Sequence, residues 1–290
     1  MEDHIRRFLG HLQAERSSSP NTLLAYRADL GQMASAISSY VGRPVTPSDL
    51  TPATLEEFVR WLSKQGYRAT TVSRKMAAAR SFIDYLARCE GLVDASLGGT
   101  LRPPPTPRHQ PRVLAALEVE ALLAAPARQR TPRGLRDAAI LELLCATGMR
   151  ASEAVGLRVE DLDLGRGVVF RRHSDGGEDQ ALPLGRAAEP LRRYLDEGRP
   201  LLARNPDVPA LFLNPRGRNL SRQGLWLVIK RWSAACGLEE AISPHTLRHT
   251  VAQQLLDSGS PRKRVQELLG LSSPNTLGAR AGRARAVEGQ

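Results

Sequence analysis

The stretch SPHTLRHTVAQQLLDSGSPRKRVQELLGLSSPNTLGAR, residues 243–280, decides how the whole chain is interpreted. It opens on serine followed by proline, which is typical of a helix N-terminus. On the helix that follows, His245 and Arg248 are three residues apart and therefore share a face. A proton-transfer group beside a bidentate anion donor suits a phosphate ligand. Taken alone, however, the segment is better explained as a solvated helix start with polar residues on its outer face.

Composition sets the broad class of the protein. The chain has 290 residues, of which 41% are hydrophobic and 24% charged, as in a soluble globular protein of about two domains. No apolar run approaches the roughly 20 residues of a membrane span, and the first residues lack a secretory signal. The three cysteines, Cys89, Cys145 and Cys236, form no CxxC pair. We therefore expect a reducing, cytoplasmic location, no membrane partner and no cysteine-based zinc site.

The charge of the chain predicts an anionic partner. Its net charge is +11 and its isoelectric point about 10.4, and the basic residues are mostly arginine, the better bidentate phosphate ligand. Nucleic acid is the leading candidate, because domains this basic commonly bind it. A basic surface that serves solubility, or arginine enrichment from a GC-rich genome, remains an alternative.

Residues 1–100 are predicted to form a compact module of four amphipathic helices. Apolar residues recur at helical spacing over 3–15, from about Pro20, from Thr51-Pro52, and from Val72 to Leu86. The last helix also carries basic residues, which suit either a solvated face or contact with a DNA backbone. These residues are Arg68, Arg74, Lys75, Arg80 and Arg88.

A proline-rich, basic segment, LRPPPTPRHQPR at 101–112, then reads as an extended linker. The second domain, 113–290, is predicted to be mostly helical with a small β-sheet. Short strands are expected at 168–170 and 181–184, and HSDGGEDQ between them has the chemistry of a hairpin turn.

A second stretch, ATGMRASEAVGLRVEDLDL at residues 146–164, contains another candidate phosphate ligand. Arg150 follows a Thr-Gly turn, and Glu153 is placed to cap the short helix that restarts after it. An arginine at a helix start is held near backbone N–H groups that also favour anions. If the fold brings Arg150 to His245 and Arg248, two guanidinium groups and one imidazole surround a single phosphate.

At these residues the sequence resembles the tyrosine recombinases, the phage integrase family, and most closely its bacterial Xer-like members. SSSPNTLLAYRADL and RATTVSRKMAAARSFIDYL resemble the family's N-terminal four-helix core-binding (SAM-like) domain. The 146–164 stretch resembles the box of the first catalytic arginine, and SPHTLRHTVAQQLLDSG resembles the HxxR box. The resemblance assigns Arg150, His245 and Arg248 as catalytic residues.

The resemblance also implies a reaction. In that family a tyrosine attacks a DNA phosphodiester, forms a 3′-phosphotyrosyl link and releases a 5′-hydroxyl that attacks another strand. The exchange needs no metal and no other cofactor. The implied partners are duplex DNA carrying a specific recombination site and a related recombinase in a hetero-tetramer, and chromosome-dimer resolution is the expected process.

Three positions depart from the family pattern. Asp175 stands where the family's hairpin lysine belongs, Leu271 where it carries His or Trp, and Arg280 where it carries the nucleophilic tyrosine. Arginine cannot act as that nucleophile, and leucine offers no hydrogen bond. We therefore expect a DNA-binding member of the family whose strand cleavage is impaired when it acts alone.

The sequence allows several explanations of these three departures. The polar tail after Arg280 also fits a frameshift or truncation, although Asp175 and Leu271 lie before it and favour decay of the whole site. The chain would then act as a non-cleaving partner or as a regulator that occupies a DNA site. It would instead be an active recombinase if it used a tyrosine not recognised here, or one supplied in trans.

Overall fold

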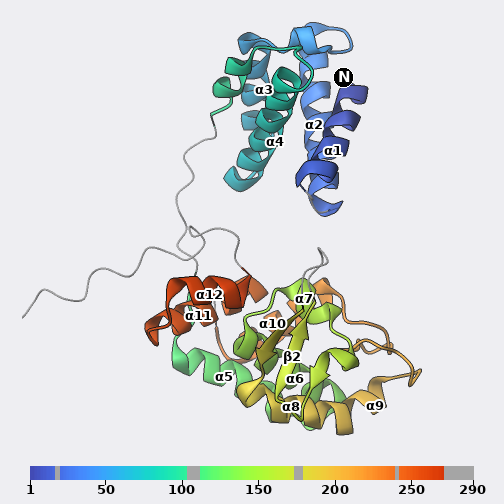
Figure 1. The fold of residues 1–290 in the computed structure, drawn as a ribbon, viewed down its shortest axis with the longest axis vertical. Helices are drawn as coiled ribbons and strands as arrows, with labels where there is room; N and C mark the ends of the chain where they lie inside the picture. Colours follow the sequence, from blue (N-terminus) through green and yellow to red (C-terminus); the bar gives the residue numbers. More distant parts are fainter. Residues whose placement is uncertain (17–19, 103–111, 173–178, 239–241, 271–290) are drawn as a thin grey trace, which may run out of the picture. The chain divides into compact units, whose positions relative to one another are not determined.

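The computed structural model describes residues 1–16, 20–102, 112–172, 179–238 and 242–270 (Figure 1). The chain forms two compact units, residues 1–109 and 110–290, and each is described by itself. The predicted linker crosses this division, and its residues 103–111 lie outside the described part. Within the described ranges, no helix is both long and apolar enough to span a membrane. The predicted fold class is confirmed, since a helical unit precedes a mostly helical unit with one small sheet.

The N-terminal unit is a helical module around one apolar core. Its elements are α1 Glu2–Arg16, α2 Pro20–Val41, η1 Pro47–Asp49, α3 Pro52–Lys64, α4 Ala69–Arg88 and η2 Ala95–Thr100, where η marks a 3-10 turn. Each long helix turns an apolar stripe inward, so that Phe8, Leu30, Phe58 and Phe82 are at most 1% exposed. The shared core explains why helical periodicity was a sound guide to these four helices.

Three of the five basic residues predicted along α4 make contacts within the unit, while Arg68 and Arg88 are exposed. Lys75 is only 4% exposed, and its Nζ donates to Asp29 at 2.8 Å and to Gln32 at 2.6 Å. Arg74 also pairs with Asp29, which is itself buried, and Arg80 donates to backbone carbonyl oxygens near η2. A buried carboxylate needs cationic partners. These three side chains therefore serve the fold of the unit.

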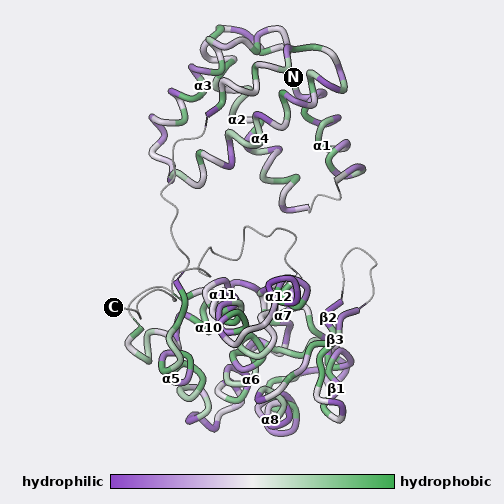
Figure 2. Tube along the Cα trace, turned by 60° about the vertical axis from the view of Figure 1, so that its left-hand side comes forward, coloured by the Kyte–Doolittle hydropathy of each residue, from purple (hydrophilic) through white to green (hydrophobic). Residues whose placement is uncertain are grey.

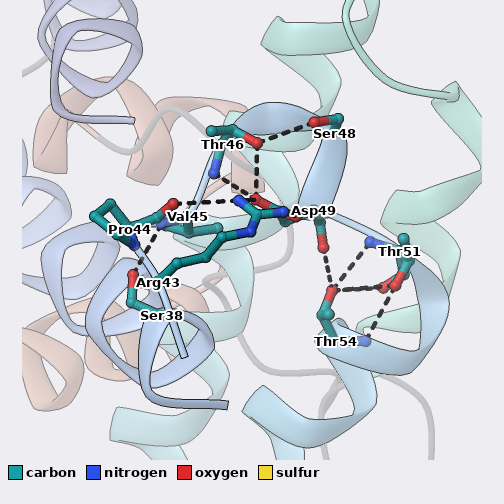
Figure 3. Close-up of polar contacts among 9 residues, drawn as sticks. All are labelled: Ser38, Arg43, Pro44, Val45, Thr46, Ser48, Asp49, Thr51 and Thr54. Carbon is teal, nitrogen blue, oxygen red and sulfur yellow. Dashed lines mark hydrogen bonds and ion pairs between the residues drawn. The ribbon is translucent and has the colours of Figure 1, made fainter. Parts of the chain in front are cut away.

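A network of polar contacts stabilises the segment that connects α2 and α3 (Figure 3). Asp49 accepts two hydrogen bonds from Arg43, at 2.9 and 2.5 Å, and two from Thr46, at 2.8 Å from its backbone N–H and 2.7 Å from its hydroxyl. The Asp49 backbone carbonyl accepts from the Thr54 hydroxyl at 2.6 Å. The hydrogen bonds from Thr46, and then the Arg43 guanidinium, lower the pKa of Asp49 from 3.8 to about 2.

This network predicts a stability loss in acid. A lowered folded-state pKa favours the ionised carboxylate in the folded state, so its contribution is complete above about pH 4 and is lost as the pH falls towards 2. We expect Asp49→Asn to lower the melting temperature at pH 6 and the difference from the wild type to shrink between pH 4 and pH 2. Melting curves by circular dichroism check this, with Asp3→Asn, which is 79% exposed, as the control. A difference that stays constant with pH would contradict it.

The C-terminal unit packs helices around α6 and a short sheet. Its elements are α5 Ala116–Ala127, α6 Pro132–Thr147, α7 Ala151–Gly156, η3 Val159–Asp161, β1 Leu162–Asp163, β2 Val168–Arg171, β3 Gln180–Pro183, η4 Gly185–Ala187, α8 Ala188–Arg193, the π-helical turn η5 Tyr194–Gly198, α9 Arg199–Leu202, α10 Arg222–Ala235, α11 Pro244–Asp257 and α12 Arg262–Leu269. In Figures 1 and 2, α7, α11 and α12 lie at one end of this unit and α8 at the other. Figure 2 also shows α12 as mostly hydrophilic.

The sheet has the strand order β1-β2-β3, and both pairs are antiparallel. Val169 faces Leu182, and Arg171 faces Gln180. The two predicted strands are therefore confirmed, with β1 as an additional strand. Of the predicted hairpin turn, residues 173–180, the first six (173–178) lie outside the described residues.

Candidate functional site

Arg150 occupies the start of α7, as its position after a Thr-Gly turn suggested. Its backbone N–H donates to the Glu153 carboxylate at 2.7 Å, so Glu153 caps the helix as expected. The guanidinium Nη1 donates to the other Glu153 oxygen at 2.7 Å, and Nη2 donates to the backbone carbonyl of Gly270 at 2.5 Å. The side chain is 46% exposed. Arg150 is thus fixed in direction while part of it faces solvent.

Arg248 lies inside the unit on α11 and is 6% exposed. Its Nη1 donates at 2.7 Å to the carbonyl of Gly148, a residue 100 positions earlier in the chain, and its Nη2 donates to the carbonyl of Leu269. Gly148 ends α6 in the left-handed region at φ +60°, and a Cβ atom there would lie 2.4 Å from the side chain of Leu269. Glycine is therefore needed both for the backbone angle and for the close approach.

The two arginines are electrostatic neighbours. Burial, followed by the positive charge of Arg150, lowers the pKa of Arg248 to about 10, while Glu153 acts in the opposite direction. Arg248 therefore keeps its charge at neutral pH. The structure brings Arg150 and Arg248 to the two ends of the same turn, Gly148–Arg150.

His245 lies one turn before Arg248 on α11, on an exposed part of the helix. Its Nε2 is 2.9 Å from the Nε2 of His249, and the two rings meet edge to face with centroids 4.4 Å apart. One hydrogen bond between two Nε2 atoms uses a single proton. Burial, and then the neighbouring His245 and Arg248, lower the pKa of His249. His249 is thus the hydrogen-bond partner of His245.

Arg171, on β2, is a member of this cluster that sequence reasoning missed. It is 3% exposed, its Nη1 lies 4.0 Å from the Glu153 carboxylate, and its Nη2 donates to the side chain of Gln180. The one signal that could have found it is strand alternation, because Val169 and Arg171 point to the same, buried face of β2.

The positions that depart from the family pattern, Asp175, Leu271 and Arg280, all lie outside the described residues. The structure therefore gives no account of them, and their assignment stays a prediction from the sequence.

Two family models match the chain. The one described as "Phage integrase family" matches residues 112–280, and the one described as "Phage integrase, N-terminal SAM-like domain" matches residues 5–90. Together they cover both units.

Proteins of known family are similar over nearly the whole chain. Tyrosine recombinase XerC of Roseiflexus sp. (strain RS-1) is 40% identical over 279 residues, which cover 95% of this chain and 88% of that protein. Tyrosine recombinase XerD of Listeria monocytogenes serotype 4b (strain F2365) is 37% identical over 280 residues, covering 95% and 92%.

Solved structures agree with this family. The crystal structure of XerA recombinase matches with a TM-score of 0.53 and 26% identity, covering 95% of this chain and 91% of that one. XerH site-specific recombinase bound to difH substrate matches with a TM-score of 0.65 and 22% identity, covering 89% and 75%, which supports the fold alone. The resemblance seen in the sequence is confirmed, and the chain belongs to the phage integrase family of tyrosine recombinases, with Xer-type proteins among its relatives.

Proposed function

We propose that this chain binds duplex DNA at a specific recombination site and does not cleave it unaided. The observation that supports binding is the convergence of Arg150 and Arg248 on the turn Gly148–Arg150, with His245 one helical turn away. Two guanidinium groups so placed can hold one phosphate of a DNA backbone, and an imidazole beside them can exchange a proton with it.

The expectation of impaired cleavage rests on the residues of the chain itself. A lysine at the hairpin position, a His or Trp near the phosphate and a nucleophilic tyrosine would all be needed for the family's reaction. Asp175, Leu271 and Arg280 stand at those positions in the sequence. A phosphate bound between Arg150 and Arg248 would then be held without a group to attack it.

The proposed process is site-specific recombination or integration, with chromosome-dimer resolution as the expected subtype. XerC and XerD proteins are both among the relatives, and one related structure, XerH, is bound to its difH substrate. We propose that this chain joins a related recombinase in a mixed assembly and contributes DNA binding to it. The proposed location is the cytoplasm, which suits the free cysteines Cys89, Cys145 and Cys236.

The DNA-binding proposal is tested by titrating a duplex recombination site with the chain across salt concentrations. Each phosphate contact contributes about −0.9 to the slope of log affinity against log salt. We expect a steep negative slope for the wild type, and weaker binding with a slope smaller in magnitude by about 1 for Arg150→Gln.

Arg192→Gln is the matched control for this titration. Arg192 is 50% exposed on α8, at the end of the unit away from α7, α11 and α12 (Figure 1). Arg192→Gln removes the same charge as Arg150→Gln, but at a position away from the proposed phosphate site. The slope of log affinity against log salt should therefore stay close to that of the wild type. A flat slope for the wild type, or equal losses for both variants, would contradict the proposal.

A further inference from the structure

The Arg171 guanidinium, like that of Arg248, is buried inside this unit. Its side chain is 4% exposed, and Nη1 is buried without a hydrogen-bond partner among the described residues. In the part of the chain that the structure describes, its ion-pair partner is the Glu153 carboxylate at 4.0 Å, which already receives two hydrogen bonds from Arg150. Burying an ionised group that lacks a hydrogen bond lowers the stability of the folded protein. We therefore expect another interaction to compensate for this cost.

The charges around Arg171 are not balanced. Within the described residues of the cluster, three guanidinium groups (Arg150, Arg171 and Arg248) face one carboxylate, that of Glu153. Burial has the largest effect on the pKa of Arg171 and lowers it; Glu153 raises this pKa, and Arg150, with a smaller effect, lowers it. The three cations repel one another at short range, and a bound anion would relieve that repulsion.

The backbone of Gly270 lies beside both Arg171 and Arg150. A Cβ atom on Gly270 would lie 3.3 Å from Nη2 of Arg171 and 3.6 Å from Nη1 of Arg150, so Gly270 fits closely against both guanidinium groups. Arg150 is half-exposed, whereas Arg171 is buried. An anion that reaches Arg150 would therefore interact with Arg171 through its charge and through the shared Glu153.

We propose that Arg171 is a positioning residue of the phosphate site, a buried third cation that orients Glu153 behind Arg150 and strengthens anion binding without touching the anion. Arg171 belongs to β2, four positions before Asp175, so the hairpin retains one positive charge at the site although its expected lysine is absent. A guanidinium supplies charge but no proton. The inference deepens the proposed function, because it takes the anion to be a DNA phosphate.

The test uses the full chain and inorganic phosphate, titrated at constant ionic strength against chloride. Phosphate affinity is measured from the concentration dependence of the melting temperature and by calorimetry. Removing one positive charge from a buried cluster is expected to weaken phosphate binding about tenfold or more in Arg171→Gln. Arg171→Lys, which keeps the charge, should stay within about threefold of the wild type.

Arg172→Gln is the matched control, because Arg172 follows Arg171 directly but is 49% exposed and pairs with Glu160 and Asp161. Its phosphate affinity should equal that of the wild type. A purely structural role would lower the melting temperature of Arg171→Gln and leave phosphate affinity within twofold. That outcome overturns the inference, as does a wild type that shows no preference for phosphate over chloride.

A second measurement does not depend on the folding of Arg171→Gln. The Nε–Hε signal of Arg171 in wild-type protein, assigned by its loss in Arg171→Lys, should shift at the same phosphate concentrations as the signal of Arg150. A signal that stays in place while that of Arg150 shifts overturns the inference.

Repeating both measurements with duplex DNA separates this inference from the proposed function. If the affinity for DNA does not depend on the charge of residue 171, the proposed role of Arg171 is wrong, while the proposed function is still supported. Phosphate binding that depends on Arg171, without affinity for DNA, overturns the proposed function and leaves the anion site.

Discussion

A nicked duplex substrate, which traps the covalent intermediate of an active recombinase, is expected to give no protein–DNA adduct with this chain alone. The reason is that residues 110–290 contain a single tyrosine, Tyr194. The other tyrosines of the chain belong to the N-terminal unit and are Tyr26, Tyr40, Tyr67 and Tyr85.

Tyr194 is unsuited to attack a phosphate. It is 0% exposed, stacks on Phe212 with ring centroids 5.7 Å apart, and its hydroxyl accepts a hydrogen bond from the backbone N–H of Leu213 at 3.2 Å. Burial raises the pKa of its hydroxyl, which disfavours the phenolate. In a well-studied hydrolase, loss of the covalent nucleophile costs about a million-fold in rate, and we expect an effect of that order here.

A denaturing gel measures the adduct directly. Arg280→Tyr combined with Asp175→Lys is expected to produce an adduct that the wild type lacks, since these changes restore two of the three missing groups, the nucleophile and the hairpin acid. Arg280→Phe with Asp175→Lys is the matched control, because it lacks only the hydroxyl and should give none. A wild-type adduct abolished by changing a single tyrosine to phenylalanine would refute impaired cleavage. An adduct that appears only when a related recombinase is added would show a tyrosine supplied in trans.

Replacing Asp137 by alanine is expected to cost the C-terminal unit about 3–5 kcal/mol of unfolding free energy. Asp137 is 1% exposed, and its Oδ1 accepts hydrogen bonds from Arg136 at 2.9 and 2.6 Å. Its Oδ2 accepts from the indole N–H of Trp232 at 2.9 Å. Arg136, which is 5% exposed, also donates to the carbonyl of Leu213 at 2.9 Å. Without the carboxylate, a buried guanidinium loses its counter-charge and an indole donor loses its acceptor.

Urea unfolding measures this cost. The chain has three tryptophans, of which Trp226 and Trp232 lie on α10, so a Trp61→Phe background lets fluorescence report on the C-terminal unit. Asp137→Asn, which keeps the shape and loses the charge, should fall between alanine and the wild type. Asp196→Ala, at an exposed position in the same unit, is the control and should cost little. A loss below about 1 kcal/mol for Asp137→Ala would mean that the network contributes little to stability.

Much of the candidate site was predictable because its parts carry local signals. Arg150 follows a Thr-Gly turn and precedes a capping glutamate, and His245 follows a serine–proline helix start; the structure has Gly148, Glu153 and Ser243 in those capping roles. Arg171 was missed because strand alternation, the one local sign of its burial, is weak over a strand of four residues. Asp175, Leu271 and Arg280 were identified through the family pattern alone, and they remain predictions.

The amino-acid sequence by itself determined the helices, the two strands of the hairpin and the caps. Those features depend on interactions between residues a few positions apart, at a period of 3.6 or 2. Tertiary structure alone decided which charges are internal. Lys75 is buried by its pairing with Asp29, and Arg248 by its hydrogen bond to a carbonyl 100 residues away. The burial of a charged group depends on partners that only folding brings together, and Arg171 joins the site for that same reason.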